Sequence, residues 1–535
     1  MSSEGGEAAP SSHRNGAFQV DALVEAKAPR SDQPAILDVR RPQGWRASVL
    51  LFAGAAGLLL ISNGADNVPL AAWLAPVLLL RFTRTQSLQV GLPAAYAVLV
   101  MAFAFDFRGM APVPGVAYYI VLAAFGLPLL LPYLLDRLLA PRLNGFVATL
   151  VFPTAYVAAE WLLSRGPYGT WASIAYSQYG DLALLQILAV TGIWGITFLI
   201  GWFAAVCNLV WEEGLGSGRA RTAAWVCAAT IATVIAIGGV SLAVSQPSGQ
   251  TVRVAGLSKL DLPATQVDGP SDRLFENKAT AADLTALRQA YSVTEDDLLA
   301  RTEREMRAGA KIVFWGEANA PVLKEDEAAF VARGQALAAK YQAYLGMALG
   351  VRRAGRHSAV ENKIALVQPN GAVAWEFSKA RPVPGAEAYM QVPSTGKLLV
   401  ATSPYGRLSS VICFDADFPE VVAQAGGLRT DILLVPSNDW RAIDPWHTQM
   451  ASFRAIEQGV NLVRQTSHGL SAAYDFQGRR LASADYFQSA DQAMISEVPT
   501  QGRHTLYAAL GDWFAFACIG GLALLAAMGL APWRR

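Results

Sequence analysis

Charged residues are scarce in this chain. Asp, Glu, Lys and Arg make up 16% of its 535 residues, whereas a typical soluble domain carries about 25%. Hydrophobic residues account for 53% of the sequence, which predicts a large part embedded in a membrane. The net charge of +1 at pH 7 offers no excess of positive charge to a nucleic acid, so we expect no nucleic-acid partner.

Cysteine and histidine are rare as well. The four cysteines are too few and too scattered for a disulfide framework, and the five histidines lack the spacing of a metal site. We therefore expect no metal and no other cofactor. Cys207, Cys227 and Cys518 fall in apolar runs, which leaves Cys413 as the one cysteine in the polar part of the chain.

Long apolar runs divide the chain into domains. Seven runs of roughly membrane-spanning length precede a polar stretch, and an eighth follows it. They predict a seven-helix membrane domain at 46–244, a polar domain at 245–505, and a closing membrane helix with a short end at 506–535. The eight runs are 47–62, 69–82, 87–105, 116–135, 146–163, 184–211, 222–244 and 513–531.

The N-terminal segment 1–45 is rich in Ser, Gly, Ala, Pro and charge and has no apolar period. This composition predicts a disordered cytoplasmic tail. No cleavable signal peptide precedes the first apolar run, which we expect to act as an uncleaved membrane signal.

The positions of the arginines predict the orientation. With a cytoplasmic N-terminus, eleven arginines near the run ends lie inside, and only Arg108 and Arg165 lie in short outer loops. The positive-inside rule then places the polar domain outside the cytoplasm and both termini inside it. The eleven are Arg40, Arg41, Arg46, Arg81, Arg84, Arg137, Arg142, Arg219, Arg221, Arg534 and Arg535.

The polar domain alternates short β-rich runs with helical patterns. Its helical patterns lie at 293–308, 325–340 and 445–459. Such alternation over one long stretch predicts a layered α/β domain. The β-rich runs are 252–257, 311–315, 344–351, 362–369, 408–414 and 431–437.

Ionisable side chains lie at three points where a strand is expected to end. Glu317 follows "IVFW", Lys379 precedes a Pro- and Gly-rich loop that holds Glu387, and Cys413 follows "SSVI". Because ligands bind where the strands of α/β sheets end, these groups could converge on one site. Taken alone, a cysteine after a strand is more often a buried filler than a nucleophile, and the single-residue interpretations of Glu317 and Lys379 are a solvated turn residue and an ordinary surface lysine.

Together the three residue types make a workable catalytic set. A thiol must become a thiolate before it attacks a carbonyl, so it needs a base and a nearby cation. Glu317 would accept the proton, and Lys379 would stabilise the thiolate and the oxyanion. A Cys–His pair with His447 or His468 is the rival interpretation, although neither histidine sits in a recognisable thiol-protease motif.

The order Glu, Lys, Cys at strand ends resembles the nitrilase (carbon–nitrogen hydrolase) superfamily, whose members share an αββα sandwich. The segment "PSNDWRAIDPWHTQMASFRAIEQGVNLVRQTSHGLSAAYDFQGR" (436–479) resembles that superfamily's strand, turn, long helix and final hairpin. A nitrilase-like domain set between seven spans and one resembles the bacterial apolipoprotein N-acyltransferases. The membrane stretch 160–200 and "TLYAALGDW" (505–513) are similar to this family too.

The resemblance implies a role for each site residue. Cys413 would be the nucleophile, Glu317 the general base and Lys379 the transition-state stabiliser, with Glu387 as a second glutamate. Three motifs depart from the family's usual pattern, namely "WGEANAP", "SKARPVPGAE", and Phe-Asp in place of Tyr-Glu after the cysteine. Residues expected near the active site are Glu387, Phe414, Asp415 and Trp440.

The resemblance also implies a reaction. A membrane phospholipid would acylate Cys413 as a thioester, and the α-amine of a lipoprotein's N-terminal diacylglyceryl-cysteine would accept the chain. The enzyme would lie in the bacterial cytoplasmic (inner) membrane with its catalytic domain on the outer side. A membrane-anchored amidase that uses water, and a non-catalytic scaffold, are the competing interpretations.

Aromatic residues gather in the outer loop 164–183. An ordinary interfacial aromatic belt and a substrate-entry surface both account for them. The four aromatic residues are Tyr168, Trp171, Tyr176 and Tyr179.

Overall fold

The computed structural model describes residues 44–247, 249–259, 264–489 and 491–531. The predicted N-terminal tail therefore lies outside the described residues, apart from its last two positions. Trp45 already begins the first helix.

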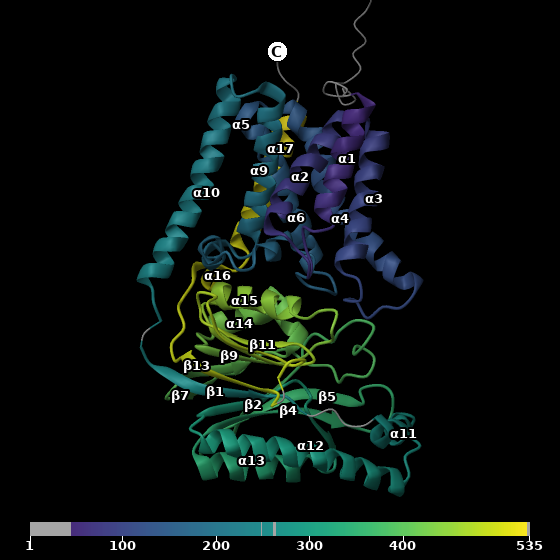
Figure 1. Ribbon diagram of the computed structural model, residues 1–535, viewed down its shortest axis with the longest axis vertical. Helices are drawn as coiled ribbons and strands as arrows, with labels where there is room; N and C mark the ends of the chain where they lie inside the picture. Colours follow the sequence, from purple (N-terminus) through teal and green to yellow (C-terminus); the bar gives the residue numbers. More distant parts are fainter. Residues whose placement is uncertain (1–43, 248, 260–263, 490, 532–535) are drawn as a thin grey trace, which may run out of the picture. The chain divides into compact units, whose positions relative to one another are not determined.

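The first half of the described chain is a bundle of apolar helices (Figure 1). A helix occupies each of the eight predicted apolar runs. The helices are α1 (Trp45–Leu59), α2 (Pro69–Thr85), α3 (Leu88–Asp106), α4 (Val116–Leu139), α5 (Gly145–Ala148), α6 (Val151–Ser164), α7 (Leu182–Leu185), α8 (Leu188–Thr191), α9 (Trp194–Glu213), α10 (Gly218–Val244) and, at the far end of the chain, α17 (Trp513–Leu530).

Six segments of the described chain are long and apolar enough to cross a membrane. Helix α1 is apolar but has 15 residues, and α2 has 17 residues and carries Arg81 and Arg84. The chain is thus a multi-pass membrane protein, but the count of eight spans is not confirmed. The six segments are Leu88–Asp106, Val116–Arg142, Gly145–Ser164, Trp194–Glu213, Gly218–Val244 and Trp513–Leu530.

The run predicted as one span at 184–211 is broken in two. The short helix α7 ends at Leu185 and α8 ends at Thr191, just before Gly192, whose φ of 64° is left-handed. Helix α9 then begins at Trp194. A Cβ atom at Gly192 would lie 2.5 Å from the ring of Tyr507. Glycine is therefore required here both for the backbone angle and for the close approach of that ring.

The polar stretch folds into two β-sheets. The first has the strand order β13-β1-β2-β4-β5-β6, with β3 paired to β4, and the second has the order β12-β11-β10-β9-β8-β7. The strands are β1 (Thr251–Leu257), β2 (Ile312–Trp315), β3 (Ala320–Leu323), β4 (Tyr344–Arg352), β5 (Val360–Val367), β6 (Val373–Ser378), β7 (Ala401–Ser403), β8 (Gly406–Ser410), β9 (Ile432–Asn438), β10 (Asn461–Ser467), β11 (Leu470–Tyr474), β12 (Arg480–Asp485) and β13 (Ala493–Pro499).

Helices cover the outer face of each sheet. Helices α12 and α13 lie against the first sheet, and α14 and α15 lie against the second, on the side of the membrane helices (Figure 1). This is the αββα sandwich that the sequence predicted. The helices of this part are α11 (Ala264–Phe275), α12 (Ala281–Arg307), α13 (Glu327–Tyr341), α14 (Pro419–Gly427), α15 (Trp446–Gln458) and α16 (Leu506–Leu510).

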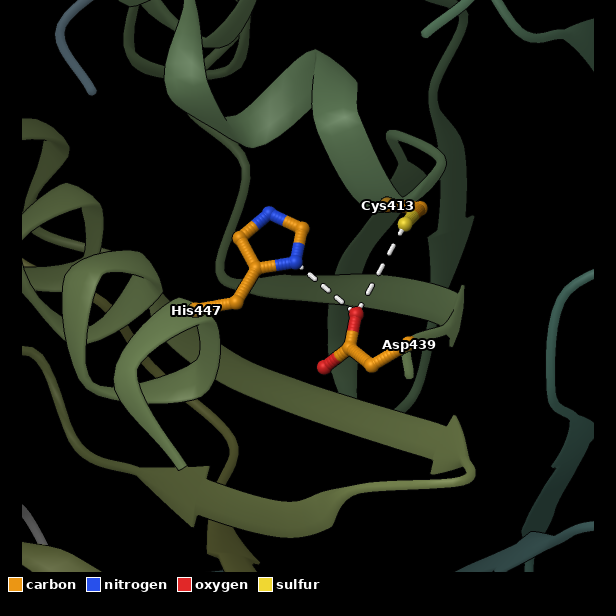
Figure 2. A group of neighbouring side chains, drawn as sticks. All are labelled: Cys413, Asp439 and His447. Atoms are coloured by element: carbon orange, nitrogen blue, oxygen red, sulfur yellow. Dashed lines mark hydrogen bonds and ion pairs between the residues drawn. The ribbon is translucent and has the colours of Figure 1, made fainter. Parts of the chain in front are cut away.

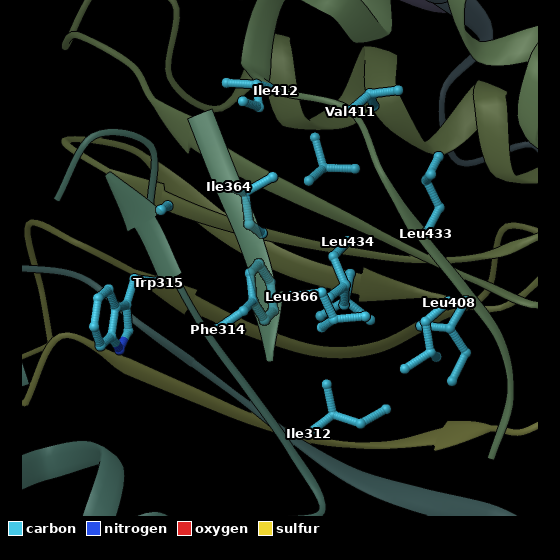
Figure 3. Close-up of a cluster of buried hydrophobic side chains, with 14 of the residues drawn as sticks. Ile312, Phe314, Trp315, Ile364, Leu366, Leu408, Val411, Ile412, Leu433 and Leu434 are labelled. Atoms are coloured by element: carbon cyan, nitrogen blue, oxygen red, sulfur yellow. The ribbon is translucent and has the colours of Figure 1, made fainter. Parts of the chain in front are cut away.

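The space between the sheets is filled by branched and aromatic side chains (Figure 3). Phe314 and Ile364 of the first sheet and Leu434 of the second are fully buried. Strand β9 is apolar at successive positions because its sheet is covered on both faces. Burial on both faces holds the strand ends, and thus the residues that follow them, in fixed positions.

All six predicted strands have counterparts, but one boundary is wrong. Val411 and Ile412 are expected to end the strand just before Cys413, whereas β8 already ends at Ser410. Val411 still donates its backbone N–H to the Leu434 carbonyl, and the chain then turns into a 3₁₀ helix at Cys413–Asp417. The apolar side chains of Val411 and Ile412 are buried without being part of the strand.

The packing of the core predicts different losses of stability when two leucines are replaced by alanine. Leu434→Ala should destabilise the protein by about 2–5 kcal/mol, because it leaves a cavity between the two sheets. Leu481→Ala, on β12, should change the stability by less than about 0.5 kcal/mol, because its side chain is 37% exposed. Thermal unfolding midpoints of the purified proteins measure both effects, and equal losses would contradict the sandwich packing.

Candidate active site

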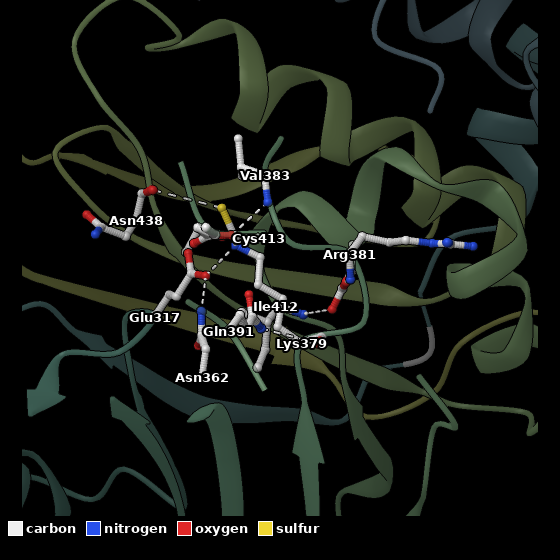
Figure 4. A network of polar contacts seen from close by, with 12 residues as sticks. Glu317, Asn362, Lys379, Arg381, Val383, Gln391, Ile412, Cys413 and Asn438 are labelled. Atoms are coloured by element: carbon white, nitrogen blue, oxygen red, sulfur yellow. Dashed lines mark hydrogen bonds and ion pairs between the residues drawn. The ribbon is translucent and has the colours of Figure 1, made fainter. Parts of the chain in front are cut away.

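Three strand ends bring Glu317, Lys379 and Cys413 to one place (Figure 4). Glu317 follows β2, Lys379 follows β6 and Cys413 follows β8. All three are buried, with 3%, 1% and 3% of their surfaces exposed. The site therefore lies at one edge of the sandwich and excludes most water.

The Lys379 ammonium lies between two carboxylates. Its Nζ is 2.7 Å from Glu317 Oε1 and 2.6 Å from Glu387 Oε2. Glu317 Oε1 also accepts a hydrogen bond from Asn362 Nδ2 at 2.6 Å. Burial opposes the charge on Lys379, but the two carboxylates outweigh it and hold the lysine pKa well above its usual range. The lysine is therefore a fixed positive charge.

Cys413 occupies a strained backbone position. Its φ of 48° lies in the left-handed region that non-glycine residues rarely adopt. The thiol lies 3.9 Å from both the Asn438 carbonyl and Asp439 Oδ1. Burial raises the pKa of the thiol well above its usual value, and Glu317 raises it further, while Lys379 and Arg464 lower it. The resting thiol is thus protonated and needs a base.

Asp415 ties the lysine loop to the cysteine loop. Its carboxylate accepts backbone N–H bonds from Ile412 at 3.0 Å, from Ala380 at 3.0 Å and from Arg381 at 2.7 Å. Burial raises its pKa from 3.8 to about 7. Asp415 therefore fixes the spacing between Lys379 and Cys413, as a backbone-binding group.

An apolar cavity leads from the membrane helices to Cys413. It has an empty volume of about 660 Å³. Trp440 closes one side and donates its Nε1–H to the Gly109 carbonyl at 2.8 Å. The lining residues come from α3, α4, the loops after α3 and α6, and the sandwich. They include Phe103, Phe107, Leu122, Phe125, Tyr168, Trp171, Cys413, Phe414, Trp440 and His447.

Part of the outer loop 164–183 packs on the sandwich. Thr170 donates its N–H and its hydroxyl to the Asp417 carbonyl at 2.9 and 2.8 Å. The Trp171 ring lies 5.2 Å from the His447 ring and 6.4 Å from the Phe414 ring. The Tyr179 hydroxyl is 3.2 Å from that of Tyr474. These aromatic residues therefore contact the site and its surroundings, which an interfacial belt alone would not require.

Comparisons with known proteins agree with this architecture. The carbon–nitrogen hydrolase family matches residues 284–501, and the N-terminal domain of apolipoprotein N-acyltransferase matches residues 55–206. The chain belongs to the apolipoprotein N-acyltransferase family, within the nitrilase superfamily.

Relatives of this family match along most of the chain. An apolipoprotein N-acyltransferase of Rhodopseudomonas palustris is 27% identical over 91% of this chain and 96% of its own length. Those of Pseudomonas putida and Geobacter metallireducens are each 26% identical, over 91% and 72% of this chain and 98% and 75% of their own lengths. A solved amidase from Nesterenkonia sp. is 18% identical, with a TM-score of 0.35 over 47% of this chain and 92% of that chain.

His447 was the weaker sequence candidate, yet it lies in the site. Its Nδ1 is 2.8 Å from Asp439 Oδ1 (Figure 2). Its Nε2 is 2.9 Å from Asp417 Oδ2. His468 instead bonds to the side chain of Asn438. The sequence offers one signal for His447, which is the nearby "SND" turn. Asp439 belongs to this turn, and His447 follows it by eight residues, on α15.

Cys413, Asp439 and His447 bring three ligand atoms within 4.8 Å of one another. Such a set suits zinc by atom type. However, Arg464 Nη2 lies 2.8 Å from both Asp439 Oδ1 and His447 Nδ1. A metal would have to displace a buried guanidinium from its own carboxylate partner, so this arrangement does not fit a metal ion.

The position of Lys379 predicts a large loss of folding stability when its charge is removed. Lys379→Met should destabilise the protein by about 3–5 kcal/mol, because Glu317 and Glu387 would face each other in a buried site without a cation. Lys397→Met is the matched control, since this lysine is exposed, and should be nearly neutral. Unfolding midpoints measure both, and equal midpoints would show that Lys379 does not hold the two carboxylates together.

The raised pKa of Asp415 predicts a pH dependence of stability. Between pH 3.8 and about 7 the folded protein retains a proton that the unfolded chain releases, so this group makes stability fall as the pH rises. Asp415→Asn removes that titration. The unfolding midpoint of the variant minus that of the wild type should therefore increase from pH 4 to pH 7. A constant difference would contradict the shifted pKa.

Proposed function

We propose that this chain transfers a fatty acyl chain from a membrane phospholipid to the α-amine of the N-terminal diacylglyceryl-cysteine of lipoproteins. One observation carries the proposal: the apolar cavity bounded by membrane helices ends at a buried thiol beside Glu317 and Lys379. Such a cavity suits an acyl chain dissolved in lipid, and the thiol suits its ester carbonyl. The names of the relatives support the same reaction.

The first half-reaction acylates Cys413. Glu317 takes the thiol proton, and the sulfur attacks the ester carbonyl of the phospholipid. The tetrahedral oxyanion is stabilised by the positive charge of Lys379. The C–O bond then breaks, the lysophospholipid oxygen takes the proton from Glu317, and a thioester remains on Cys413.

The second half-reaction transfers the chain to the acceptor. The neutral α-amine attacks the thioester carbonyl, and Glu317 accepts a proton from the nitrogen. The C–S bond breaks, Cys413 regains a proton, and an amide is formed. Because the donor product leaves before the acceptor reacts, the kinetics should be ping-pong. The apolar lining of the cavity supports the exclusion of water from the thioester.

Four further residues assist in this proposal. Glu387 shares the Lys379 ammonium with Glu317 and so keeps the lysine in place. Asp415 sets the spacing of the lysine and cysteine loops. Phe414 and Trp440 line the cavity and would contact the acyl chain next to the thiol.

The proposal includes a location and a domain division. The enzyme would lie in the bacterial inner membrane, with residues 46–244 and 506–535 in the membrane part and residues 245–505 as the outer catalytic domain. Both termini would be cytoplasmic. The arginine distribution supports this orientation, with eleven arginines on one side of the predicted spans and two on the other.

Product analysis tests the proposed reaction. Purified enzyme incubated with phospholipid and a synthetic diacylated lipopeptide should yield an N-acylated lipopeptide and a lysophospholipid. Cys413→Ala should lower this yield by at least about a thousandfold, since the nucleophile is lost. Cys518→Ala, which removes another buried cysteine, should leave it unchanged.

The same assay separates the alternatives. Release of free fatty acid without N-acylated lipopeptide would show an amidase-like hydrolase that uses water. Absence of both products, with wild type and Cys413→Ala behaving alike, would support the scaffold interpretation and overturn the proposal.

A further inference from the structure

A second polar cluster contacts Cys413 through Asp439 (Figure 2). Its centre is Asp439 Oδ1, which lies 3.9 Å from the Cys413 sulfur, 2.8 Å from His447 Nδ1 and 2.8 Å from Arg464 Nη2. Asp439, His447 and Arg464 are all at least 95% buried. The acyl-transfer steps described above do not use this cluster.

The cluster is also connected to the membrane part. His447 Nε2 lies 2.9 Å from Asp417 Oδ2, and the Asp417 carbonyl accepts both hydrogen bonds from Thr170. The Trp171 ring packs on the imidazole. His447 is therefore held between the cysteine loop, the "SND" turn and a loop between membrane helices.

We propose that His447 is a positioning residue that acts through Asp439 to make Cys413 easier to ionise. The contacts of Thr170 and Trp171, in the outer loop 164–183, help to hold His447 in this position. The inference rests on the proposed role of Cys413 as the nucleophile. Asp439 bears a negative charge next to the thiol, and that charge alone disfavours the thiolate. His447 and Arg464 both contact Asp439 Oδ1, the oxygen that faces the sulfur. These contacts weaken the repulsion between the Asp439 carboxylate and a Cys413 thiolate.

His447 is not itself the base for the thiol. Both of its ring nitrogens face carboxylate oxygens, and Asp439 supplies the contact with the sulfur. Burial and Arg464 oppose a proton on the imidazole, but Asp417 and Asp439 outweigh them and raise its pKa above 6.5. The two carboxylates therefore make the imidazole easier to protonate than an ordinary histidine.

The polar and titratable groups around His447 come from five segments of the chain. The loop 170–171 adds the Thr170 hydroxyl, which lies 2.6 Å from the hydroxyl of Tyr176, and Tyr176 accepts a bond from Arg454 Nη2. The groups that face the histidine or its direct partners are Cys413 and Asp417 of the 3₁₀ helix, Asp439 after β9, Arg464 of β10 and Arg454 of α15.

Two variants should shift Cys413 in opposite directions. In His447→Gln a side chain that can carry a proton next to Asp439 is replaced by a neutral one, so the pH at which Cys413 is half-ionised should rise by about one unit, and its alkylation at pH 7 should slow about tenfold. In Asp439→Asn the negative charge beside the sulfur is lost, so that pH should fall and alkylation should quicken. His357→Gln, an exposed histidine, should change nothing.

The measurement is the pH profile of alkylation by a small neutral haloacetamide, followed at Cys413 by peptide mass spectrometry in the full-length enzyme. The buried cysteines Cys227 and Cys518 report on folding in the same sample, because they become reactive if the protein unfolds. If His447→Gln unfolds, Asp439→Asn still tests the inference, because the pH at which Cys413 is half-ionised should fall in that variant.

An unchanged profile in the folded variants, or a shift of both in the same direction, would overturn the inference. The profile does not depend on phospholipid, so it is independent of the proposed reaction. If the wild type fails to form N-acylated lipopeptide while the two shifts occur as expected, the proposed function fails and the role of His447 remains.

Discussion

The active site depends on one buried cation held between two carboxylates. An ammonium without partners could not remain charged at a position as buried as that of Lys379, and Glu317 and Glu387 make that charge permanent. The two β-sheets bring these charged groups together because three of their strands end at the same edge of the sandwich. There Asp415 joins the lysine and cysteine loops through backbone hydrogen bonds. Cys413 is placed there at the expense of a left-handed backbone angle.

The membrane helices provide what the sandwich alone lacks, which is an apolar path to the thiol. Residues of α3, α4 and the outer loop line the cavity with Cys413. The loop is attached to the cysteine loop by the two Thr170 bonds and by the packing of Trp171. The position of Cys413 and the shape of the apolar cavity are therefore set by the same contacts. Because membrane helices and the sandwich line the same cavity, the donor that we propose is a lipid. The attachment of the sandwich to membrane helices at both of its ends fits the same arrangement.

Much of this could be predicted from the sequence, because local patterns carried it. Apolar runs predicted the membrane helices, short β-rich runs predicted the strands, and ionisable residues directly after strands pointed to Glu317, Lys379 and Cys413. Three features depended on contacts between distant segments and could not be predicted. The break at Gly192 lies inside a continuous apolar run and follows from the approach of Tyr507. Val411 and Ile412 are apolar because they are buried, although the strand has ended. His447 and Trp171 meet only in the folded chain.

Intact mass spectrometry of the full-length enzyme incubated with phospholipid alone tests the central claim most directly. The account predicts that the wild type gains the mass of one fatty acyl chain, that hydroxylamine removes it, and that peptide mapping places it on Cys413. A protein that never gains this mass, or that gains it equally after Cys413→Ala, would contradict the claim that the buried thiol is acylated next to Lys379.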